Sequence, residues 1–160
     1  MSAQSNDTNK VWDMMEKVGV AMLVTKDGEK LRSRPMGAFV SRDENKVYFL
    51  ADARQHKDSE IERFASVNLA FANASSQKYV SVTGRAEVSN DRGKIKELFN
   101  TAAKAWWQSA DDPNIRVLKV TPDDAEYWDT PGTVVAYVKM AAAAATGTRP
   151  EIGDNKKVRM

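Results

Sequence analysis

Two clusters of basic residues have the types and spacing to bind an anion. In the first, LRSRPM, Arg32 and Arg34 are two positions apart, so their side chains share one face if the segment is a strand. A guanidinium group presents forked donors that suit a phosphate. The alternative is a pair of solvated arginines on an edge strand, and the spacing alone favours that alternative.

The second cluster lies in residues 51–59, ADARQHKDS, between an expected strand and an expected helix. The first turn of a helix presents free backbone amides that attract a phosphate, and Lys57 would add a full charge, with Arg54 and His56 beside it. The alternative is a capped helix start with surface charges, and a lone loop His56 is not assigned a catalytic role. Together the two clusters indicate one anion site more strongly than either does alone.

Aromatic residues supply a third candidate. Trp106 and Trp107 are expected to pack in the core or in a dimer, whereas Trp128 precedes a Pro-Gly turn, where its indole could stack on a flat ring. The chain has no cysteine and one histidine, which excludes a cysteine nucleophile, a thiolate metal site and a two-histidine zinc site. No metal site is therefore predicted.

Charge and hydropathy restrict the partners. The 24 basic and 22 acidic residues of the 160 give a net charge of +2, and residues from 149 onward account for it, so the body is formally neutral. A neutral body argues against nucleic-acid binding. With no signal-peptide pattern and no apolar run of spanning length, we expect a cytoplasmic protein with no membrane contact.

These residues must be positioned by short strands and few helices. Residues 1–9 are expected to be disordered, 10–146 to form one domain, and 147–160 to be a polar, basic tail. Alternation, turn signals and helical spacing predict the elements. The expected strands are 20–25, 30–40, 47–51, 67–72, 78–89, 115–128 in two pieces, and 133–140; the expected helices are 11–18, 58–66 and 91–107, with a short helix at 141–145. This pattern predicts a mainly β, α+β fold, an antiparallel barrel of six to seven strands with two main helices.

Five segments in succession carry a family resemblance across nearly the whole chain. They are LRSRPM, VYFLADARQHKDSEI, YVSVTGRAEV, VLKVTPDDAEYWD and GDNKKV. In order and spacing the chain resembles the general stress protein branch of the pyridoxamine 5′-phosphate oxidase-like flavoproteins. The resemblance implies a split β-barrel that binds FMN, with FAD or a deazaflavin as alternatives, in a homodimer with the flavin at the subunit interface.

The resemblance also implies site residues by position. Arg34 matches the arginine near the FMN phosphate, with Arg32 and Ser33 beside it, and Lys57 matches a phosphate-binding lysine preceded by Gln55 and His56. The backbone of Ala51 and Asp52 falls where the family places a strand end against the flavin ring. Tyr79 and Ser81 lie on a strand bordering the flavin, and Trp128 matches an aromatic residue contributed by the other protomer.

The implied function is an FMN-dependent, stress-related oxidoreductase with an unknown small-molecule redox partner. After Trp128 the chain reads Asp129-Thr130-Pro131-Gly132, where the true oxidases have an Arg-x-His segment that helps to hold substrate. The resemblance thus implies flavin binding rather than pyridoxamine phosphate oxidation. The alternatives are a non-catalytic flavin carrier or redox sensor and, more distantly, a small barrel that binds single-stranded nucleic acid.

Overall fold

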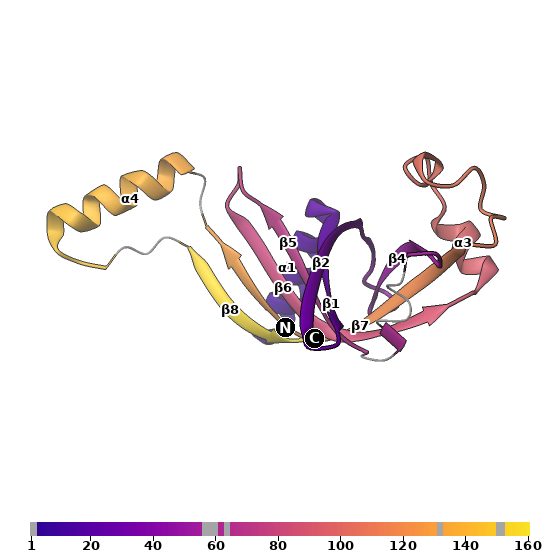
Figure 1. Cartoon of the computed structure of the whole chain (residues 1–160). Helices are drawn as coiled ribbons and strands as arrows, with labels where there is room; N and C mark the ends of the chain where they lie inside the picture. The colour runs from indigo at the N-terminus through magenta and orange to yellow at the C-terminus, as the bar shows by residue number, and fades with distance from the viewer. Residues whose placement is uncertain (1–2, 56–60, 63–64, 131–132, 150–152) are drawn as a thin grey trace.

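An antiparallel sheet of eight strands forms the body of the molecule (Figure 1). The computed structural model describes residues 3–55, 61–62, 65–130, 133–149 and 153–160. The strands are β1 (Val20–Asp27), β2 (Lys30–Gly37), β3 (Phe39–Ser41), β4 (Lys46–Asp52), β5 (Ser66–Asn73), β6 (Lys78–Ser89), β7 (Ile115–Asp129) and β8 (Asp154–Arg159). The helices are α1 (Ala3–Val18), α3 (Arg92–Leu98), the 3-10 helix η1 (Ala103–Ala105) and α4 (Thr133–Thr146).

The long strand β7 organises the sheet. The strand order is β2-β1-β5-β6-β7-β4-β3, and β8 also pairs with β7. One edge of β7 pairs with β6; along the other edge, residues 115–120 pair with β4 and residues 124–129 pair with β8. The sheet curls until β2 contacts β4, which gives the expected split β-barrel with one strand more than the predicted six to seven.

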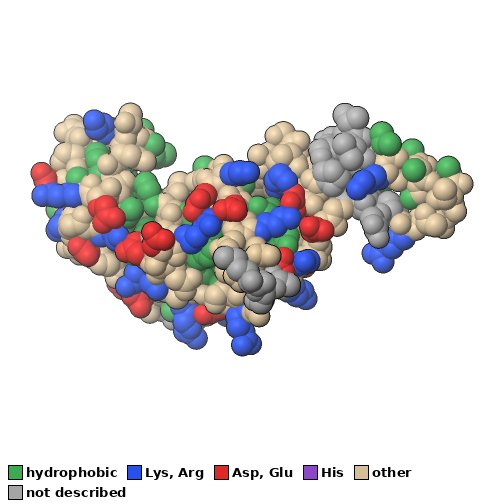
Figure 2. Space-filling model, turned by 180° about the vertical axis from the view of Figure 1, so that it is seen from behind, with side chains coloured by type: hydrophobic (Ala, Val, Ile, Leu, Met, Phe, Trp, Pro, Cys, Tyr) green, Lys and Arg blue, Asp and Glu red, His purple; other side chains and the backbone are tan. Residues whose placement is uncertain are grey.

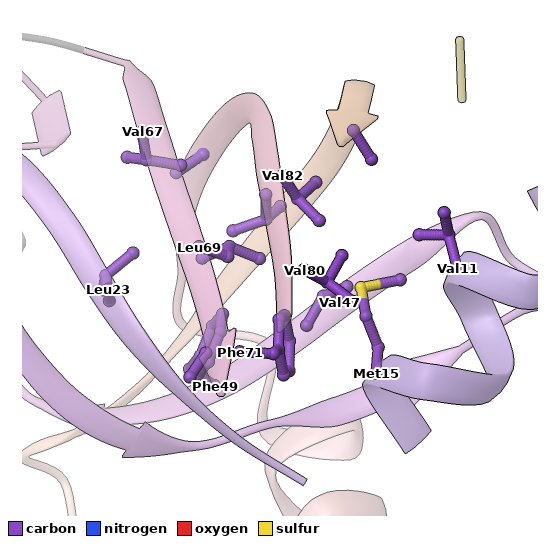
Figure 3. Packing of buried hydrophobic residues seen from close by; sticks show 14 of the residues in the cluster. Val11, Met15, Leu23, Val47, Phe49, Val67, Leu69, Phe71, Val80 and Val82 are labelled. Carbon is purple, nitrogen blue, oxygen red and sulfur yellow. The ribbon is translucent and has the colours of Figure 1, made fainter. Parts of the chain in front are cut away.

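Alternating apolar residues fill the inner face of the sheet. On β6, Val80 and Val82 are buried while their neighbours are more exposed, as a strand covered on one face requires. Helix α1 covers this face, and its Val11 and Met15 are fully buried among the strand side chains (Figure 3). Gly19 ends the helix as predicted, with a left-handed φ of 72° and its N–H bonded to the Met15 carbonyl.

The outer face of the sheet is covered on one side only. Outward residues of β4 and of the first part of β7 pack with α3 and η1 in a second cluster that includes Leu50, Ile95, Trp107 and Ile115. In the part of the chain that the structure describes, no such layer covers the outer faces of β1 and β6, and Val20, Met22, Tyr79 and Trp128 are exposed there. We call the outer surface of β2, β1, β5, β6, the end of β7, and β8 the open face.

One prediction for the C-terminal region was wrong, and the structure places the polar tail, whose packing the sequence left open. Residues 133–140 are not a strand, because α4 covers them and continues through the alanine run 141–145, whose residues are strong helix formers. The edge of β7 is already shared by β4 and β8, so little of it is left for another strand. The tail after residue 147 is not wholly irregular, since β8 pairs with β7 and Val158 is buried.

Other differences concern element ends. Helix α1 begins at Ala3, so residues 3–9 are helical rather than disordered. The helix expected to reach residue 107 stops at Leu98, and the Asn100 side chain then accepts a bond from the Ala103 N–H at the start of η1. Its predicted N-cap, Asp91, is confirmed by a 3.1 Å bond from the Lys94 N–H.

In the expected helix 58–66, the described residues 61–62 are helical, whereas Ser66 already belongs to β5. Among the described residues, none of the helices is both long and apolar enough to cross a membrane.

Candidate functional site

The two arginines of the first cluster lie on the inner face of β2, an edge strand of the sheet. Arg34 is paired in register with the buried Leu23, and its Nη1 donates to Thr25 Oγ1 at 2.8 Å. Thr25 is the buried polar residue of the β1 strand, 1% exposed, so this bond fixes the guanidinium at the rim of the barrel. Arg32 lies next to it on the same face, with its side chain 59% exposed and paired to Asp27 at 2.9 Å. The predicted shared face is confirmed.

The end of β4 holds Ala51 and Asp52 in different environments. The Ala51 side chain is buried in the main core, while Asp52 points to the second cluster. Its carboxylate accepts bonds from Arg54 Nε at 2.8 Å and Nη2 at 2.6 Å, and from Trp107 Nε1 at 3.3 Å. The Arg54 bonds, with a smaller contribution from Trp107, hold the pKa of Asp52 well below its usual range, against the effect of burial. Asp52 therefore stays ionised, and its bonds to Arg54 and Trp107 hold the end of β4 in place.

The chain beyond β4 carries the remaining residues of the second cluster. Gln55 is exposed, and its N–H donates to the Asp52 carbonyl at 3.0 Å in a tight turn. His56 and Lys57, which were predicted to bind a phosphate, lie outside the described residues. Their contribution stays a prediction.

The aromatic candidates lie on the open face. Tyr79 and Trp128 are directly paired across β6 and β7, and each is 37% exposed. Ser81 follows on the same face and accepts a bond from Asn68 Nδ2 at 3.0 Å. Ser33 of β2 also lies on the open face, opposite to the side of its neighbours Arg32 and Arg34.

A shallow hollow of about 690 Å³ adjoins these residues on the open face. It is lined by acidic residues of β7, by the β6 residues Ser81 and Thr83, and by Lys157 and Arg159 of β8. The hollow thus carries both acidic and basic side chains and extends the open face to β8, the last strand described.

One chain cannot bring both halves of the candidate site together. Arg34 is on the inner face of β2, whereas Trp128 is on the outer face of β7. The sheet itself therefore lies between the two side chains. A single ligand that touches both residues must take them from two copies.

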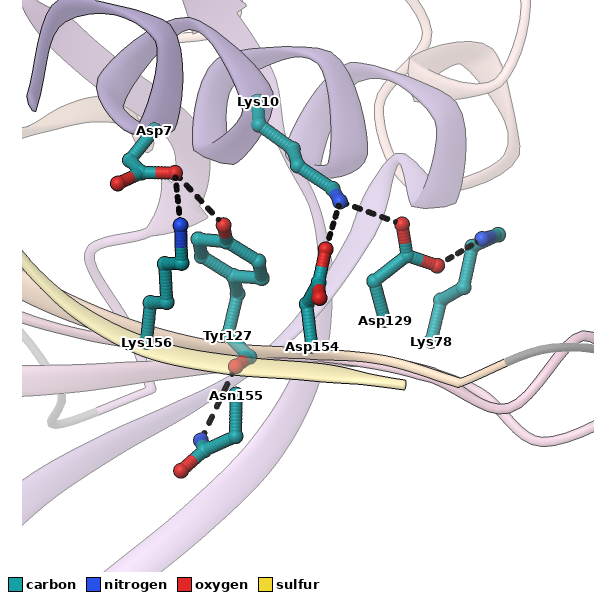
Figure 4. A network of polar contacts seen from close by, with 8 residues as sticks. All are labelled: Asp7, Lys10, Lys78, Tyr127, Asp129, Asp154, Asn155 and Lys156. Carbon is teal, nitrogen blue, oxygen red and sulfur yellow. Dashed lines mark hydrogen bonds and ion pairs between the residues drawn. The ribbon is translucent and has the colours of Figure 1, made fainter. Parts of the chain in front are cut away.

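A polar network beneath Trp128 anchors β8 and α1 to β7 (Figure 4). Lys10 Nζ lies 2.8 Å from Asp129 Oδ2 and 3.3 Å from Asp154 Oδ2, and Asp129 also pairs with Lys78. Burial opposes ionisation, but the bonds from Lys10 and Lys78 hold the pKa of Asp129 below its usual value. This end of β7 is therefore rigidly held.

The neighbouring part of the network joins α1 to β7 and β8 through Asp7. Tyr127 Oη donates to Asp7 Oδ1 at 2.9 Å, and Lys156 lies 3.4 Å from the same oxygen. Burial, together with the bond to Asp7, raises the pKa of Tyr127 to about 12. Tyr127 is therefore a neutral hydrogen-bond donor that holds the helix to the sheet.

The roles of two residues near the candidate site, Thr25 and Trp107, could not be predicted from the sequence. Thr25 resembles any strand threonine, yet it orients Arg34. Trp107 was expected to pack, which its 8% exposure confirms, but its bond to Asp52 could not be inferred without the fold. The adjacent Trp106 was also expected to pack, and it is 76% exposed.

Comparisons with known proteins agree with this architecture. A family model described as "Pyridoxamine 5′-phosphate oxidase like" matches residues 6–151. General stress protein 26 of Bacillus subtilis is 27% identical over 124 residues, which cover 76% of this chain and 87% of that protein.

Solved structures show the same fold. A protein assigned as general stress protein 26 from Jannaschia sp. CCS1 superposes with a TM-score of 0.77 at 23% identity, over 98% of this chain and 99% of its own. The general stress FMN/FAD binding protein from Xanthomonas citri superposes with a TM-score of 0.68 at 22% identity, over 78% of this chain and 89% of its own. Because the family model matches most of the length of this chain, the chain belongs to the pyridoxamine 5′-phosphate oxidase-like family.

Proposed function

We propose that this chain binds FMN between two copies of itself and acts as an oxidoreductase on a small-molecule redox partner. The observation that carries the proposal is the division of the candidate site between opposite faces of one sheet, with Arg34 inside and Trp128 outside. The Xanthomonas citri relative, which binds FMN/FAD, supports the choice of ligand.

The residues of the barrel rim fit the phosphate of a flavin nucleotide. A phosphate dianion needs cations and N–H donors in fixed positions. Arg34 meets this need because its bond to Thr25 orients the guanidinium at the rim, and Arg32 adds a second cation on the same face. Lys57, by its position in the sequence, would complete the set.

The open face fits the ring system. A flavin ring is flat and largely apolar, and aromatic side chains bind such rings by offset or edge contacts. Tyr79 and Trp128 form a paired aromatic surface of this kind, and Met22 on the same face is 38% exposed. When this surface lies against the rim of a second copy, the ring is sandwiched and water is excluded.

Bound FMN would supply the two-electron redox chemistry, and the chain's own residues would bind and orient it. Asp52 contributes indirectly, because its bonds to Arg54 and Trp107 hold the end of β4 beside the expected phosphate site. We place this activity in the cytoplasm.

A flavin carrier or redox sensor is the second candidate. The resolved pKa shifts in the described part of the chain strengthen ordinary charge states: Asp52 and Asp129 are shifted down, and Lys10 is shifted up by its carboxylate partners despite burial. None of these groups is adjusted toward neutral pH, as proton-transfer catalysis favours. Tight binding without turnover would fit this pattern.

The first experiment measures whether FMN stays bound. The purified chain is mixed with excess FMN and desalted, and its absorbance spectrum is recorded. We expect a retained flavin spectrum and, for Arg34→Met, FMN affinity reduced by roughly 10- to 100-fold, since a hydrogen bond to a charged group contributes about 1.5–3 kcal/mol. Arg42→Met makes the same change in an arginine whose partner is Asp13 on α1, and it should leave the affinity unchanged.

A complementation experiment tests whether two copies share the site. Arg34→Met and Trp128→Ala chains are each expected to lose flavin. Co-refolded, they form mixed dimers with one intact site and one doubly altered site, so about a quarter of all sites recover. A colourless wild type overturns the proposal, and absence of recovery overturns the shared site.

An oxidoreductase is distinguished from a flavin carrier by repeated reduction and reoxidation of the bound flavin. The FMN-loaded protein is mixed anaerobically with NADH or NADPH, and flavin bleaching is followed before electron acceptors are added. Repeated bleaching and recovery indicates an oxidoreductase. Reduction by dithionite alone, with no turnover on any acceptor, indicates a carrier or sensor.

A further inference from the structure

Helix α4 is an apolar helix that lies apart from the barrel (Figure 1). Lys139 is its one charged residue. Among its described side chains, residues 137–146, Ala143 alone is buried, whereas Tyr137 is 66%, Val138 62% and Met140 41% exposed. Figure 2 shows hydrophobic side chains on this projecting arm.

Such a helix is not expected to be stable while bathed in water. Isolated helices of fewer than about 12–15 residues are marginal even when rich in alanine. A helix that is apolar all round is normally buried. The 14 residues of α4 therefore need a cover that one chain does not give to the described side chains.

The dimensions and charge of α4 indicate that a protein rather than a membrane covers it. Fourteen residues span about 21 Å, less than the hydrocarbon core of about 30 Å. A helix that lies in the membrane surface has a strongly basic polar face. Lys139 is a single cation, and the helix has no opposing polar face.

The position of α4 indicates a second copy of this chain. The helix leaves the sheet after Asp129, one residue beyond Trp128, and the chain returns to β8 at Asp154, which pairs with Asp129. Both attachment points are thus at the margin of the open face, where the side chains of Met22, Tyr79 and Trp128 are exposed. One two-fold pairing can cover both α4 and the open face.

The areas fit a stable dimer. Six strands at about 4.8 Å, with three outward rows, give an open face of about 29 by 20 Å, or ~600 Å². One side of α4, about 21 by 10 Å, adds ~200 Å². A standard interface buries about 800 Å² on each partner, so the open face reaches that size with the arm and falls short without it.

We propose that α4 is an arm that packs against the second copy in the dimer that holds the flavin. The inference rests on the proposed function for that dimer. It adds that α4 contributes about a quarter of the buried area of each partner, and that Val138 and Met140 are buried by the second copy.

The absence of cysteine allows a direct test. A spin label is attached to Val138→Cys and, as a control, to Lys104→Cys on η1, where the side chain is also exposed. In the FMN-loaded full chain we expect the label at position 138 to be immobilised and the label at position 104 to be mobile. Diluting labelled dimers with unlabelled chain tests whether the contact lies between copies.

Sedimentation gives the energetic test. Val138→Glu with Met140→Glu is expected to raise the dimer dissociation constant by at least about 100-fold, because two carboxylates would be buried. Lys104→Glu adds the same charge to η1 and should leave the constant unchanged. A retained β-sheet circular dichroism signal and a cooperative thermal transition in the dissociated variant exclude misfolding of the barrel, whereas the helical signal of α4 is expected to fall once its cover is lost.

The outcomes separate this inference from the proposed function. A wild-type dimer with FMN, whose constant is unchanged by the double variant and whose label at 138 is mobile, overturns the arm alone. A dimer that depends on α4 but retains no FMN overturns the flavin proposal alone. A monomer that retains FMN overturns both the arm and the shared site.

Discussion

The close approach of β6 and β7 at Gly84 allows a steric prediction. The ladder shifts register between Thr83 and Gly84, where β7 turns from β4 toward β8. A Cβ placed at Gly84 would lie 2.6 Å from the Thr121 carbonyl oxygen and 3.0 Å from Val120 Cγ1. The φ of Gly84 is not left-handed, so the difficulty for Gly84→Ala is crowding alone.

The size of the effect follows from what can move. A carbonyl oxygen of the ladder cannot rotate away as a side chain can, so the two strands must separate by several tenths of an ångström. Overpacking of this kind costs about 1–3 kcal/mol, and we expect the upper end because backbone is displaced. At about 2–4 °C per kcal/mol for a chain of this size, Tm falls by roughly 5–12 °C.

The assay is thermal unfolding followed by circular dichroism, with Gly37→Ala as the matched control. A Cβ at Gly37 meets nothing within 4 Å, and its φ is not left-handed, so this change should raise Tm slightly or leave it unchanged. Below its transition, the Gly84→Ala chain should still retain FMN. A Tm within 2 °C of wild type for Gly84→Ala would refute the argument from crowding.

Three further substitutions test contacts around the site. Asp52→Asn weakens the bond from Trp107 and is expected to lower the free energy of unfolding. Because the pKa of Asp52 is lowered in the folded state, the difference between wild type and variant should be full above about pH 4 and should shrink as the pH falls below it. Chemical unfolding at pH 6 and pH 3 measures this difference, and an equal difference at both pH values contradicts the prediction. Tyr127→Phe removes the bond to Asp7 and should cost about 1 kcal/mol by urea unfolding, whereas no loss would mean that water replaces the bond. Val158→Ala removes two buried methyl groups from β8 and should lower the free energy of unfolding by about 2 kcal/mol. An unchanged free energy of unfolding would show that the Val158 side chain does not stabilise the sheet.

Local sequence signals predicted the central strands well. The alternation over residues 78–89 gives β6 with its observed bounds, and Asp27-Gly28 marks the β1–β2 turn, where Gly28 has a φ of 64°. These signals are local, since they depend on periodicity and on the backbone conformation that a turn demands.

The chain after β7 depends on tertiary context, and there the prediction of a strand at residues 133–140 failed. Residues 133–140 contain β-branched residues that suit a strand, but the alanines that follow favour a helix. The β8 segment is polar because one face is exposed, so Val158 alone marked a covered strand.

For the candidate site, spacing predicted that Arg32 and Arg34 share a face, and the strand register confirms it. The relation between Arg34 and Trp128 could not be predicted. Whether they lie on the same face depends on the strand order across five strands, which no local pattern encodes.

The contacts between α1 and β8 have a consequence for biosynthesis. Helix α1 is held by Lys10 to Asp154 and by Asp7 to Lys156, residues of β8 that are translated long after the helix. These are among the longest loop closures that the chain can make, and such closures slow folding. We expect nascent chains to keep α1 undocked and its apolar stripe accessible to chaperones until β8 has been synthesised, so that products truncated before β8 are cleared rather than folded.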